Sequence, residues 1–354
     1  MNIELKSEKL SPQITLAHGN GGKLTHDLIR SMFVTAFSAE ALSAEALSND
    51  ALSELADSAR LKLPEGEIVF TTDSHVVNPL FFPGGDIGKL AVCGTLNDLA
   101  VMGAKPLYLS CALIIEEGFE TALLKKIIDS MAEAARQNGV RIVTGDTKVV
   151  EKGAADKLFI NTAGIGVVLP GAPKGLKSFQ AGDAVLVSGS LGDHGIAIYA
   201  GREGISLQTD LQSDCACIFP LVEIALKICP ELRIMRDPTR GGLATTLNEF
   251  VQGGRFGIEL DERSLPIRDE VRGVCEILGF DPLYVANEGK LVLVLPQTSA
   301  PAVLEALKLH PLGRKAAAIG RLTERAPGRV YLKTDIGGER VLDMLVGDML
   351  PRIC

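Results

Sequence analysis

The sequence predicts an α/β protein of two domains. Its 354 residues are about twice the length of an average domain, and 46% of them are hydrophobic, which is enough for an ordinary core in each half. Strand patterns alternate with amphipathic helix patterns in both halves. A stretch rich in proline, glycine and lysine, LPGAPKGLKSFQAGD, separates the halves at 169–183. We therefore expect an N-terminal domain over 1–168, a C-terminal domain over 169–336, and a tail over 337–354.

Both halves combine strands with helices. In the first half, strands are expected at 68–73 and 107–115 and in VRIVTGDT and LFINTAGIGVVLP, with helices over 84–102 and 119–139. In the second half, helices are expected near 193–203, 214–228, 243–252, 269–278 and 301–309, and strands near 257–261, 283–286, 291–295 and 316–321. The repeat SAEALSAEALSNDAL at 38–52 fits neither period, and it predicts a loop or a marginal helix.

The composition argues against several classes of function. A net charge of −8 and a pI near 5.3 disfavour a nucleic-acid or anionic-membrane surface, because each would require a basic patch. The start MNIELKSEKL lacks the apolar run of a signal peptide, and no apolar stretch approaches the ~20 residues of a membrane span. We expect a cytoplasmic protein with neither a nucleic-acid nor a membrane partner.

The chain has seven cysteines and no C-x-x-C motif. Six of them, including Cys215 and Cys217 in an apolar helical pattern, are expected to be buried, reduced thiols. Cys354 is different, because it is the last residue of the sequence and no chain follows to bury it. A sulfur on a free end is either an accident or a reactive group.

The segment LAHGNGGKLTHDLI at 16–29 has the layout of an anion-binding turn. Gly21, Gly22 and Lys23 stand just before an amphipathic helix, where backbone N–H groups and a lysine can face a phosphate. The segment departs from the phosphate-loop motif at Ala17 and at Leu24. A flexible turn before a helix explains it equally well, so both interpretations stay open on the residues alone.

Aspartates at expected strand ends or on apolar faces form a second candidate set: Asp57, Asp73, Asp98, Asp146 and Asp237. Each one alone is more often a turn former or a helix cap. Together they fit Mg²⁺ with a nucleoside triphosphate, because the cation holds carboxylates and phosphates that otherwise repel each other. An acidic protein could then bind a polyanion.

Further segments could contribute to such a site. In MRDPTRGGLATTLNEF, Gly241 and Gly242 allow close backbone approach, and the positive end of a helix beginning at Leu243 faces the turn. VTGDTKVV adds Lys148, and YVANEGKLVLV adds Glu288. Taken singly, a solvated loop lysine and a turn acid are the better explanations of these two residues.

These segments together resemble a known family. TTDSHVVNPLFFPGGDIGKLAVCGTLNDLAVMGAKPLYLS, VTGDTKVVEKG, LVSGSLGDHGIAI, RDPTRGGLATTLNE and the terminal PRIC are similar to the HypE family of carbamoyl dehydratases, which act in hydrogenase maturation. The resemblance covers nearly the whole chain. It implies the PurM-like fold of the superfamily of aminoimidazole ribonucleotide synthetase and selenophosphate synthetase. In that fold the N-terminal sheet-plus-helices domain forms a homodimer, and the C-terminal domain has a mixed sheet.

The resemblance also implies a reaction. A carbamoyltransferase, HypF, would load a carbamoyl group onto Cys354, ATP would drive dehydration of the S-carboxamide to a thiocyanate, and cyanide would pass to iron on a HypC–HypD scaffold. In this scheme Glu288 takes the N–H proton, and Lys148 stabilises the oxygen or the leaving phosphate in the same pocket. A flexible C-terminal tail suits a sulfur that must visit three sites.

The remaining implied roles concern ATP and magnesium. The implied ATP contacts are Gly21, Gly22, Lys23, Asp73, Asn97, Asp146, Arg240 and Gly241. The implied magnesium ligands are Asp57, Asp98 and Asp237. The sequence departs from the family pattern at Ala56, where a second acidic residue is usual, which leaves Asp57 as the single carboxylate there.

Other functions remain open on the residues alone. A selenophosphate synthetase would carry a reactive cysteine beside the N-terminal glycine loop, but Asn20 stands in the loop and the first cysteine is Cys93. Another ATP-dependent enzyme of the superfamily, one that phosphorylates an amide oxygen, also fits. A thiol carrier without catalysis would need neither the aspartates nor RDPTRGG, and it would have no ATPase activity.

Overall fold

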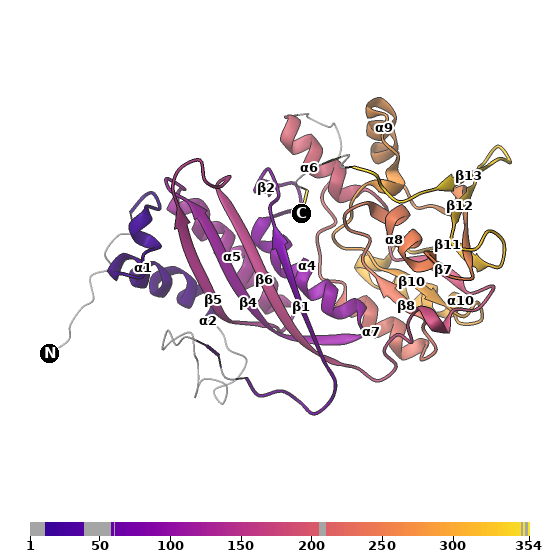
Figure 1. Cartoon of the computed structure of the whole chain (residues 1–354), viewed down its shortest axis with the longest axis horizontal. Helices are drawn as coiled ribbons and strands as arrows, with labels where there is room; N and C mark the ends of the chain where they lie inside the picture. Colours follow the sequence, from indigo (N-terminus) through magenta and orange to yellow (C-terminus); the bar gives the residue numbers. More distant parts are fainter. Residues whose placement is uncertain (1–10, 39–57, 60, 205–209, 348–349, 351–352) are drawn as a thin grey trace.

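Two large sheets define the architecture of the protein in this computed structural model (Figure 1), and a third sheet has only two short strands. The structure describes residues 11–38, 58–59, 61–204, 210–347, 350 and 353–354. One large sheet is built from the N-terminal half of the chain and the other from the C-terminal half, and helices pack on both. The predicted α/β architecture of two domains is therefore confirmed.

The structure contains most of the expected helices and strands, together with several short strands that were not predicted. Those of the N-terminal half are α1 (Lys23–Leu28), the π-helix η2 (Ile29–Val34), α2 (Thr35–Ser38), β1 (Ile68–His75), β2 (Phe81–Phe82), β3 (Gly85–Asp86), α4 (Ile87–Val101), β4 (Ala104–Glu116), α5 (Thr121–Gln137), β5 (Arg141–Val150) and β6 (Leu158–Val168). Those of the C-terminal half are β7 (Ala184–Val187), α6 (Asp193–Glu203), α7 (Phe219–Ile228), β8 (Ile234–Arg236), α8 (Gly242–Val251), β9 (Gly257–Asp261), α9 (Asp269–Leu278), β10 (Val292–Leu295), α10 (Ala300–Leu309), β11 (Ala317–Thr323), β12 (Val330–Lys333) and β13 (Glu339–Leu342). Within the described ranges, no helix combines the length and the apolar character needed to cross a bilayer.

The N-terminal sheet has the order β1-β6-β4-β5 and is covered on one face by α4 and α5 (Figure 1). Alternation along β4 turns Leu109, Cys111 and Leu113 toward these helices, where all three are buried. The opposite face carries large apolar side chains in contact with water, such as Phe70, which is 67% exposed, and Ile114, which is 43% exposed. An apolar sheet face that no described element covers is typical of a surface that packs against another chain.

The register of this sheet fixes how far apart its two edges lie. Asp146 on β5 is opposite Ala112 on β4. The same row continues through Asn161 on β6 to Ser74 on β1. Three strand spacings, about 14 Å in total, therefore separate the β1 edge from the β5 edge. Asp146 was expected at the end of a strand, but it lies within β5, which continues to Val150.

The C-terminal sheet is the middle of three layers and has the order β13-β12-β9-β11-β7-β10-β8. Val185 and Val187 of β7 share a core cluster with Leu247 of α8. The alternate residues Ala184 and Leu186 share a different cluster with α7 and α10 on the opposite face. Strands β9 and β12 pair in parallel and the other neighbours are antiparallel, so the sheet is mixed, as predicted.

The helix predicted near 214–228 begins only at Phe219, next to a proline that suits the first turn of a helix. Residues 210–218 form a segment without helix or strand instead. Cys215 and Cys217 are buried, as expected, but they lie in this segment and not in a helix. The apolar spacing misled the prediction because it cannot tell a buried non-helical segment from a buried helix.

The segment 210–218 connects the two domains through Asn97 of α4. The Asn97 amide nitrogen donates to the main-chain oxygens of Ala216 (3.0 Å) and Glu288 (3.1 Å). Its Oδ1 accepts from the main-chain N–H of Ile218 (2.8 Å). These bonds satisfy backbone groups that a helix would otherwise have paired. Asn97, which the family resemblance placed at ATP, is therefore used inside the protein to hold the domains together.

Two other predictions in the second half differ from the structure. The strand expected at 283–286 is replaced by a short 3-10 helix, Pro282–Tyr284, which begins with a proline. The range 337–354, expected to be a tail, begins with β13, which pairs with β12 at the edge of the sheet. The repeat predicted as a loop or marginal helix lies outside the described residues from residue 39 onward.

Candidate active site

The last residue of the chain lies between the two domains (Figure 1), where it packs against core residues of both. The main-chain oxygen of Cys354 accepts a hydrogen bond from the N–H of Val76, just after β1 (3.2 Å). Its Sγ accepts one from Nη2 of Arg240, just before α8 (3.3 Å). Ile353 and Leu350 are buried as well. The end of the chain thus contacts both domains, and the thiol is not on the unshielded end that its position in the sequence predicted.

Glu288 lies near this thiol, in the loop before β10. Its side chain is 2% exposed, and its Oε1 has no hydrogen-bond partner. The main-chain N–H of Glu288 donates to Oδ1 of Asp214 (3.1 Å), which holds the loop in place. Burial, followed by repulsion from Asp214 and other carboxylates, raises the pKa of Glu288 well above its usual range. The carboxyl therefore favours its protonated form and is a strong proton acceptor whenever it is ionised.

The thiol is also held in its neutral form. Burial raises the pKa of Cys354 to about 12, and the nearby Glu288 adds to the shift while Arg240 opposes it. The docked thiol is consequently a poor nucleophile, since the thiolate is the reactive species. In this state the pocket contains a thiol and a carboxyl that are both predominantly uncharged.

Three of the predicted aspartates approach the same pocket from both domains: Asp73, Asp98 and Asp237. Thr71 donates a hydrogen bond to Oδ2 of Asp98 (3.0 Å). Burial raises the pKa of Asp98 to about 6 and that of Asp237 to about 7. Repulsion from Asp73 contributes to both shifts, and repulsion from Asp98 contributes to that of Asp237. The carboxylates are therefore close enough to interact, and the positive charge of Arg236 offsets their raised pKa values only in part.

These aspartates fit Mg²⁺ in charge and in chemistry. Carboxylate oxygens are the ligands that Mg²⁺ prefers, and a divalent cation would relieve the repulsion that raises the pKa values of Asp98 and Asp237. Asp57 lies outside the described residues. Within the part of the chain that the structure describes, no three His, Cys, Asp or Glu side chains are grouped closely enough to hold a metal. The aspartates therefore fit Mg²⁺ in the type of ligand that they offer, but they do not form a complete coordination shell in this structure.

The turn that presents Arg240 depends on glycine. Gly241 has a φ of 79° and stands at the N-cap of α8. A Cβ atom at this position would come within 2.3 Å of Oγ1 of Thr245. Only glycine fits there, because the backbone is left-handed and the helix approaches closely. The glycine thus explains how the chain turns from β8 into α8 with Arg240 directed at the thiol.

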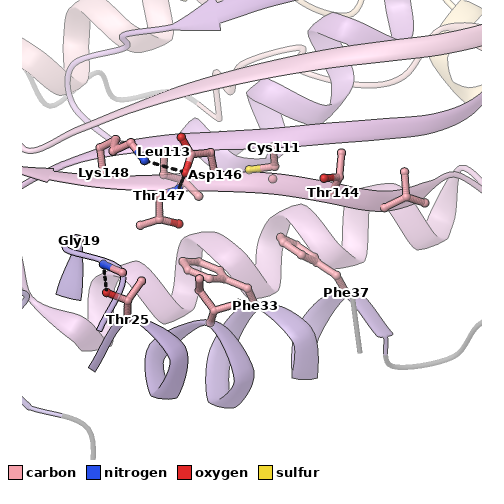
Figure 2. Close-up of a pocket in the computed structure, with 14 residues that line it drawn as sticks. Gly19, Thr25, Phe33, Phe37, Cys111, Leu113, Thr144, Asp146, Thr147 and Lys148 are labelled. Carbon is pink, nitrogen blue, oxygen red and sulfur yellow. Dashed lines mark hydrogen bonds and ion pairs between the residues drawn. The ribbon is translucent and has the colours of Figure 1, made fainter. Parts of the chain in front are cut away.

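A second group of predicted residues surrounds a cavity of ≈220 Å³ at the β5 edge of the N-terminal sheet. The cavity lies between the helical segment 23–38 and strands β4 and β5. Figure 2 shows Phe33 and Phe37 of this segment and Thr147 of β5 facing it. Asp146 and Lys148 lie together at the rim, where Nζ of Lys148 is 3.0 Å from Oδ1 of Asp146. The walls are mostly apolar and the rim is charged.

The glycine loop borders the same cavity. The N–H of Gly21 donates to Oγ1 of Thr25 (3.0 Å), and the N–H of Gly22 donates to Oδ1 of Asn20 (2.9 Å). Lys23 begins α1, which has six residues before the π-helical turns of η2. Two of the N–H groups that were expected to face an anion are therefore occupied by side chains of the loop itself in this structure.

A single chain does not bring Lys148 to Glu288, although the two were expected in one pocket. Lys148 lies on β5, whereas Cys354 contacts Val76 beyond the end of β1, at the other edge of the sheet. The two edges are about 14 Å apart. Lys148 is also paired in register with Ile114, so alternation turns it toward the open face of the sheet.

Two buried histidines of the pocket were missed by sequence reasoning. His75 is 1% exposed, its Nε2 lies 3.3 Å from Oδ2 of Asp73, and burial lowers its pKa. His194, on α6, donates from Nε2 to the main-chain oxygen of Ile353 (2.6 Å). Both stand in segments that were singled out, TTDSH and GDHG. In each segment the histidine follows an aspartate within two residues, at the end of a strand in the first and at the start of a helix in the second. This pattern could have identified both histidines as site residues.

Known proteins similar to this chain cover nearly its whole length. Two family profiles match it: AIR synthase related protein, N-terminal domain, over residues 55–168, and AIR synthase related protein, C-terminal domain, over residues 180–333. The carbamoyl dehydratase HypE of Rhodobacter capsulatus is 49% identical over 347 residues, 97% of this chain and 98% of that protein. A crystal structure of hydrogenase maturation protein HypE in complex with ATP matches with a TM-score of 0.89 at 46% identity, over 96% of this chain and 99% of that chain. A chain of a HypE–HypF complex matches with a TM-score of 0.76 at 46% identity, over 85% of this chain and 97% of that chain.

The raised pKa of Asp237 predicts a measurable dependence of stability on pH. The folded protein keeps a proton on Asp237 up to about pH 7, whereas the unfolded chain releases it near 3.8. The stabilisation is therefore complete below about pH 4 and is lost as the pH rises through about 7. Relative to Asp237→Asn, the wild-type free energy of unfolding should fall by up to about 4 kcal/mol over this range, measured by urea denaturation. A difference between the two proteins that is constant with pH would contradict the assignment.

Proposed function

The chain belongs to the HypE family of carbamoyl dehydratases, and from this premise we propose that it dehydrates an S-carbamoyl group on Cys354 to a thiocyanate at the expense of ATP. The product would supply cyanide for the iron centre of nickel–iron hydrogenase. One observation carries the proposal for this chain. The thiol of Cys354 docks between the domains near the buried carboxyl of Glu288, whose Oε1 has no other partner.

The reaction removes one oxygen and two protons from the S-carboxamide. R–S–C(=O)–NH₂ and ATP give R–S–C≡N, ADP and phosphate. An amide oxygen is a poor leaving group, so transfer of the γ-phosphoryl group to that oxygen, with release of one N–H proton, gives an iminophosphate from which phosphate leaves readily. As the phosphate departs, the remaining N–H proton must be taken up, and the carbon–nitrogen triple bond forms. The step needs a proton acceptor beside the sulfur-bound carbon.

We assign Glu288 as this proton acceptor. Its Oε1 is buried and unpartnered, so it can accept a hydrogen bond from the amide N–H of a carbamoyl group on the neighbouring sulfur. Its raised pKa gives the carboxylate a high affinity for the proton. Arg240, which contacts the sulfur from the start of α8, would hold the sulfur in place during the transfer.

ATP and Mg²⁺ are proposed as the co-substrate and the cation. ATP is bound in the solved structure of the HypE that is 46% identical to this chain. Asp98, Asp237 and Asp57 would hold Mg²⁺, which would supply positive charge to the transferring phosphoryl group. Asp73 and Gly241 border the same pocket and are proposed to contact the nucleotide.

Lys148 is proposed to act in the site of a second chain. The open face of the N-terminal sheet, with Phe70 and Ile114, is an apolar surface that a homodimer would bury. If two such faces pack around a two-fold axis along the strands, β5 of one chain lies opposite β1 of the other. Lys148, Asp146 and the glycine loop of one chain would then border the aspartates of its partner. The apolar cavity beside them suits a purine base.

The partners follow from how the thiol must be handled. A HypE chain is bound to HypF in a solved complex, so we propose that a HypF carbamoyltransferase loads Cys354 and that a HypC–HypD complex receives the cyanide. Loading requires Cys354 to leave the pocket, because the docked thiol is shielded there. All seven cysteines are free thiols, which suits the reducing cytoplasm, where we propose that the protein works.

Replacing the proposed base should stop the reaction after loading. Glu288→Gln should leave carbamoylation of Cys354 and ATP binding intact, but it should slow the ATP-dependent loss of water at least ~100-fold, measured by quenched-flow mass spectrometry. The wild-type rate should rise with pH as Glu288 ionises, and the residual rate of the variant should not. Glu133→Gln, on the exposed side of α5, is the matched control. A normal yield of thiocyanate from Glu288→Gln would exclude this role.

Mixing two inactive variants tests whether the site is shared between chains. Lys148→Ala and Cys354→Ala should each have little dehydratase activity. When the two are unfolded together and refolded in equal amounts, half of the dimers are mixed, and each mixed dimer has one complete site. Activity should then recover to roughly a quarter of the wild-type value. No recovery, with mixed dimers demonstrated by native mass spectrometry, would place Lys148 in the site of its own chain.

A further inference from the structure

We propose that His194 and Ser213 form a latch that holds the end of the chain in the pocket. The proposal concerns the position of the tail, and it rests on the proposed function only in taking Cys354 as the reacting residue. His194 does not contact the sulfur. It is therefore a positioning residue, which acts through the main chain of Ile353.

The latch is a continuous line of hydrogen bonds that starts in the segment 210–218. The main-chain N–H of Cys215 donates to Oγ of Ser213 (3.1 Å). Oγ of Ser213 lies 2.7 Å from Nδ1 of His194, and Nε2 of His194 lies 2.6 Å from the main-chain oxygen of Ile353. The next residue in the chain is Cys354. The line thus ends one residue before the thiol.

The chemistry of the last acceptor fixes the direction of every bond. The Ile353 carbonyl can only accept, so Nε2 of His194 carries the proton. Burial lowers the pKa of His194, which keeps the ring neutral, and Nδ1 is then an acceptor for the Ser213 hydroxyl proton. The Ser213 oxygen remains free to accept from Cys215. Each donor in the line therefore faces an acceptor.

The N-terminal domain holds the latch rigidly. Phe82 packs edge-on against the His194 ring at a centroid distance of 5.7 Å. The main-chain N–H of Ser213 donates to the oxygen of Pro83 (2.8 Å). Gly84 leaves room for this segment, because a Cβ atom at Gly84 would come within 2.7 Å of the main-chain oxygen of Ser213. The latch is assembled only when both domains and the segment 210–218 are in place.

Apolar burial alone cannot give the tail a defined position. Leu350 and Ile353 bury side chains in the pocket, but such contacts tolerate sliding along the chain. The bond from His194 fixes one main-chain oxygen, and the bond from Val76 to Cys354 fixes the next. If His194 loses its donor, a buried carbonyl is left without a partner, so the preference for the docked state over the undocked one becomes smaller than in the wild type.

The position of the tail can be measured without any turnover. The docked thiol is shielded and protonated, whereas an undocked thiol reacts with N-ethylmaleimide at an ordinary rate. The alkylation rate of Cys354, read from the mass of the C-terminal peptide, therefore reports the undocked fraction. Variants at His194 and Ser213, with His310→Gln as a control remote from the tail, would be compared with the intact wild-type protein.

His194→Leu should raise the alkylation rate of Cys354 by roughly tenfold, and Ser213→Ala, which removes only one hydroxyl, should raise it by a few-fold. His194→Gln should be nearer to wild type, because its amide N–H can replace the Nε2 donor. In single-turnover experiments the rate of water loss should fall in His194→Leu and Ser213→Ala in the same order as their alkylation rates rise, but by a smaller factor because it follows the docked fraction, while carbamoylation of Cys354 is not slowed. The control should match the wild type in both assays.

Two results would overturn the latch. One is an unchanged alkylation rate in both His194→Leu and Ser213→Ala. The other is a parallel rise at Cys215 and Cys217, which would mean that the variants loosen the whole core. If alkylation responds as expected but even the wild-type protein forms no thiocyanate, the latch stands and the proposed dehydration fails. The two ideas can therefore be judged separately.

Discussion

The requirement that governs this protein is that the last residue of the chain must be held between two domains beside a buried carboxyl. Glu288 has an oxygen with no hydrogen-bond partner among the described residues, and the thiol of Cys354 is docked near it. A buried polar atom without a hydrogen bond is costly, so it persists where a ligand is expected to complete it. The segment 210–218, the turn before α8 and the end of β1 all serve to shape this one pocket.

The distribution of charge follows from the same requirement. Burial keeps the thiol and Glu288 uncharged, while Asp98 and Asp237 lie close enough to repel each other. Such a site is arranged to receive positive charge together with the phosphates of a nucleotide. The lysines and the glycine loop that would help to bind the nucleotide lie at the other edge of the sheet, about 14 Å away. The division of the site between two edges explains why we expect two chains to complete it.

Local pattern predicted much of the fold but little of the assembled site. The long helix α5 followed from its apolar spacing and from Gly139, whose φ of 65° ends it as expected. The place of Asp98 on a core-facing stripe followed from the same spacing. The irregular conformation of 210–218 could not be predicted, because it depends on hydrogen bonds to Asn97, more than a hundred residues earlier. The separation of Lys148 from Glu288 depends on strand order, which no local pattern encodes.

The most direct test of the account is the intact mass of the protein after incubation with HypF, carbamoyl phosphate and MgATP, with peptide mapping of the C-terminal segment. We predict the gain of one carbamoyl group on Cys354, followed by the loss of one water from the same residue only when ATP is present. An unmodified Cys354 in a sample that nevertheless hydrolyses ATP would contradict the account. In that case the pocket around Glu288 would have to serve a different substrate.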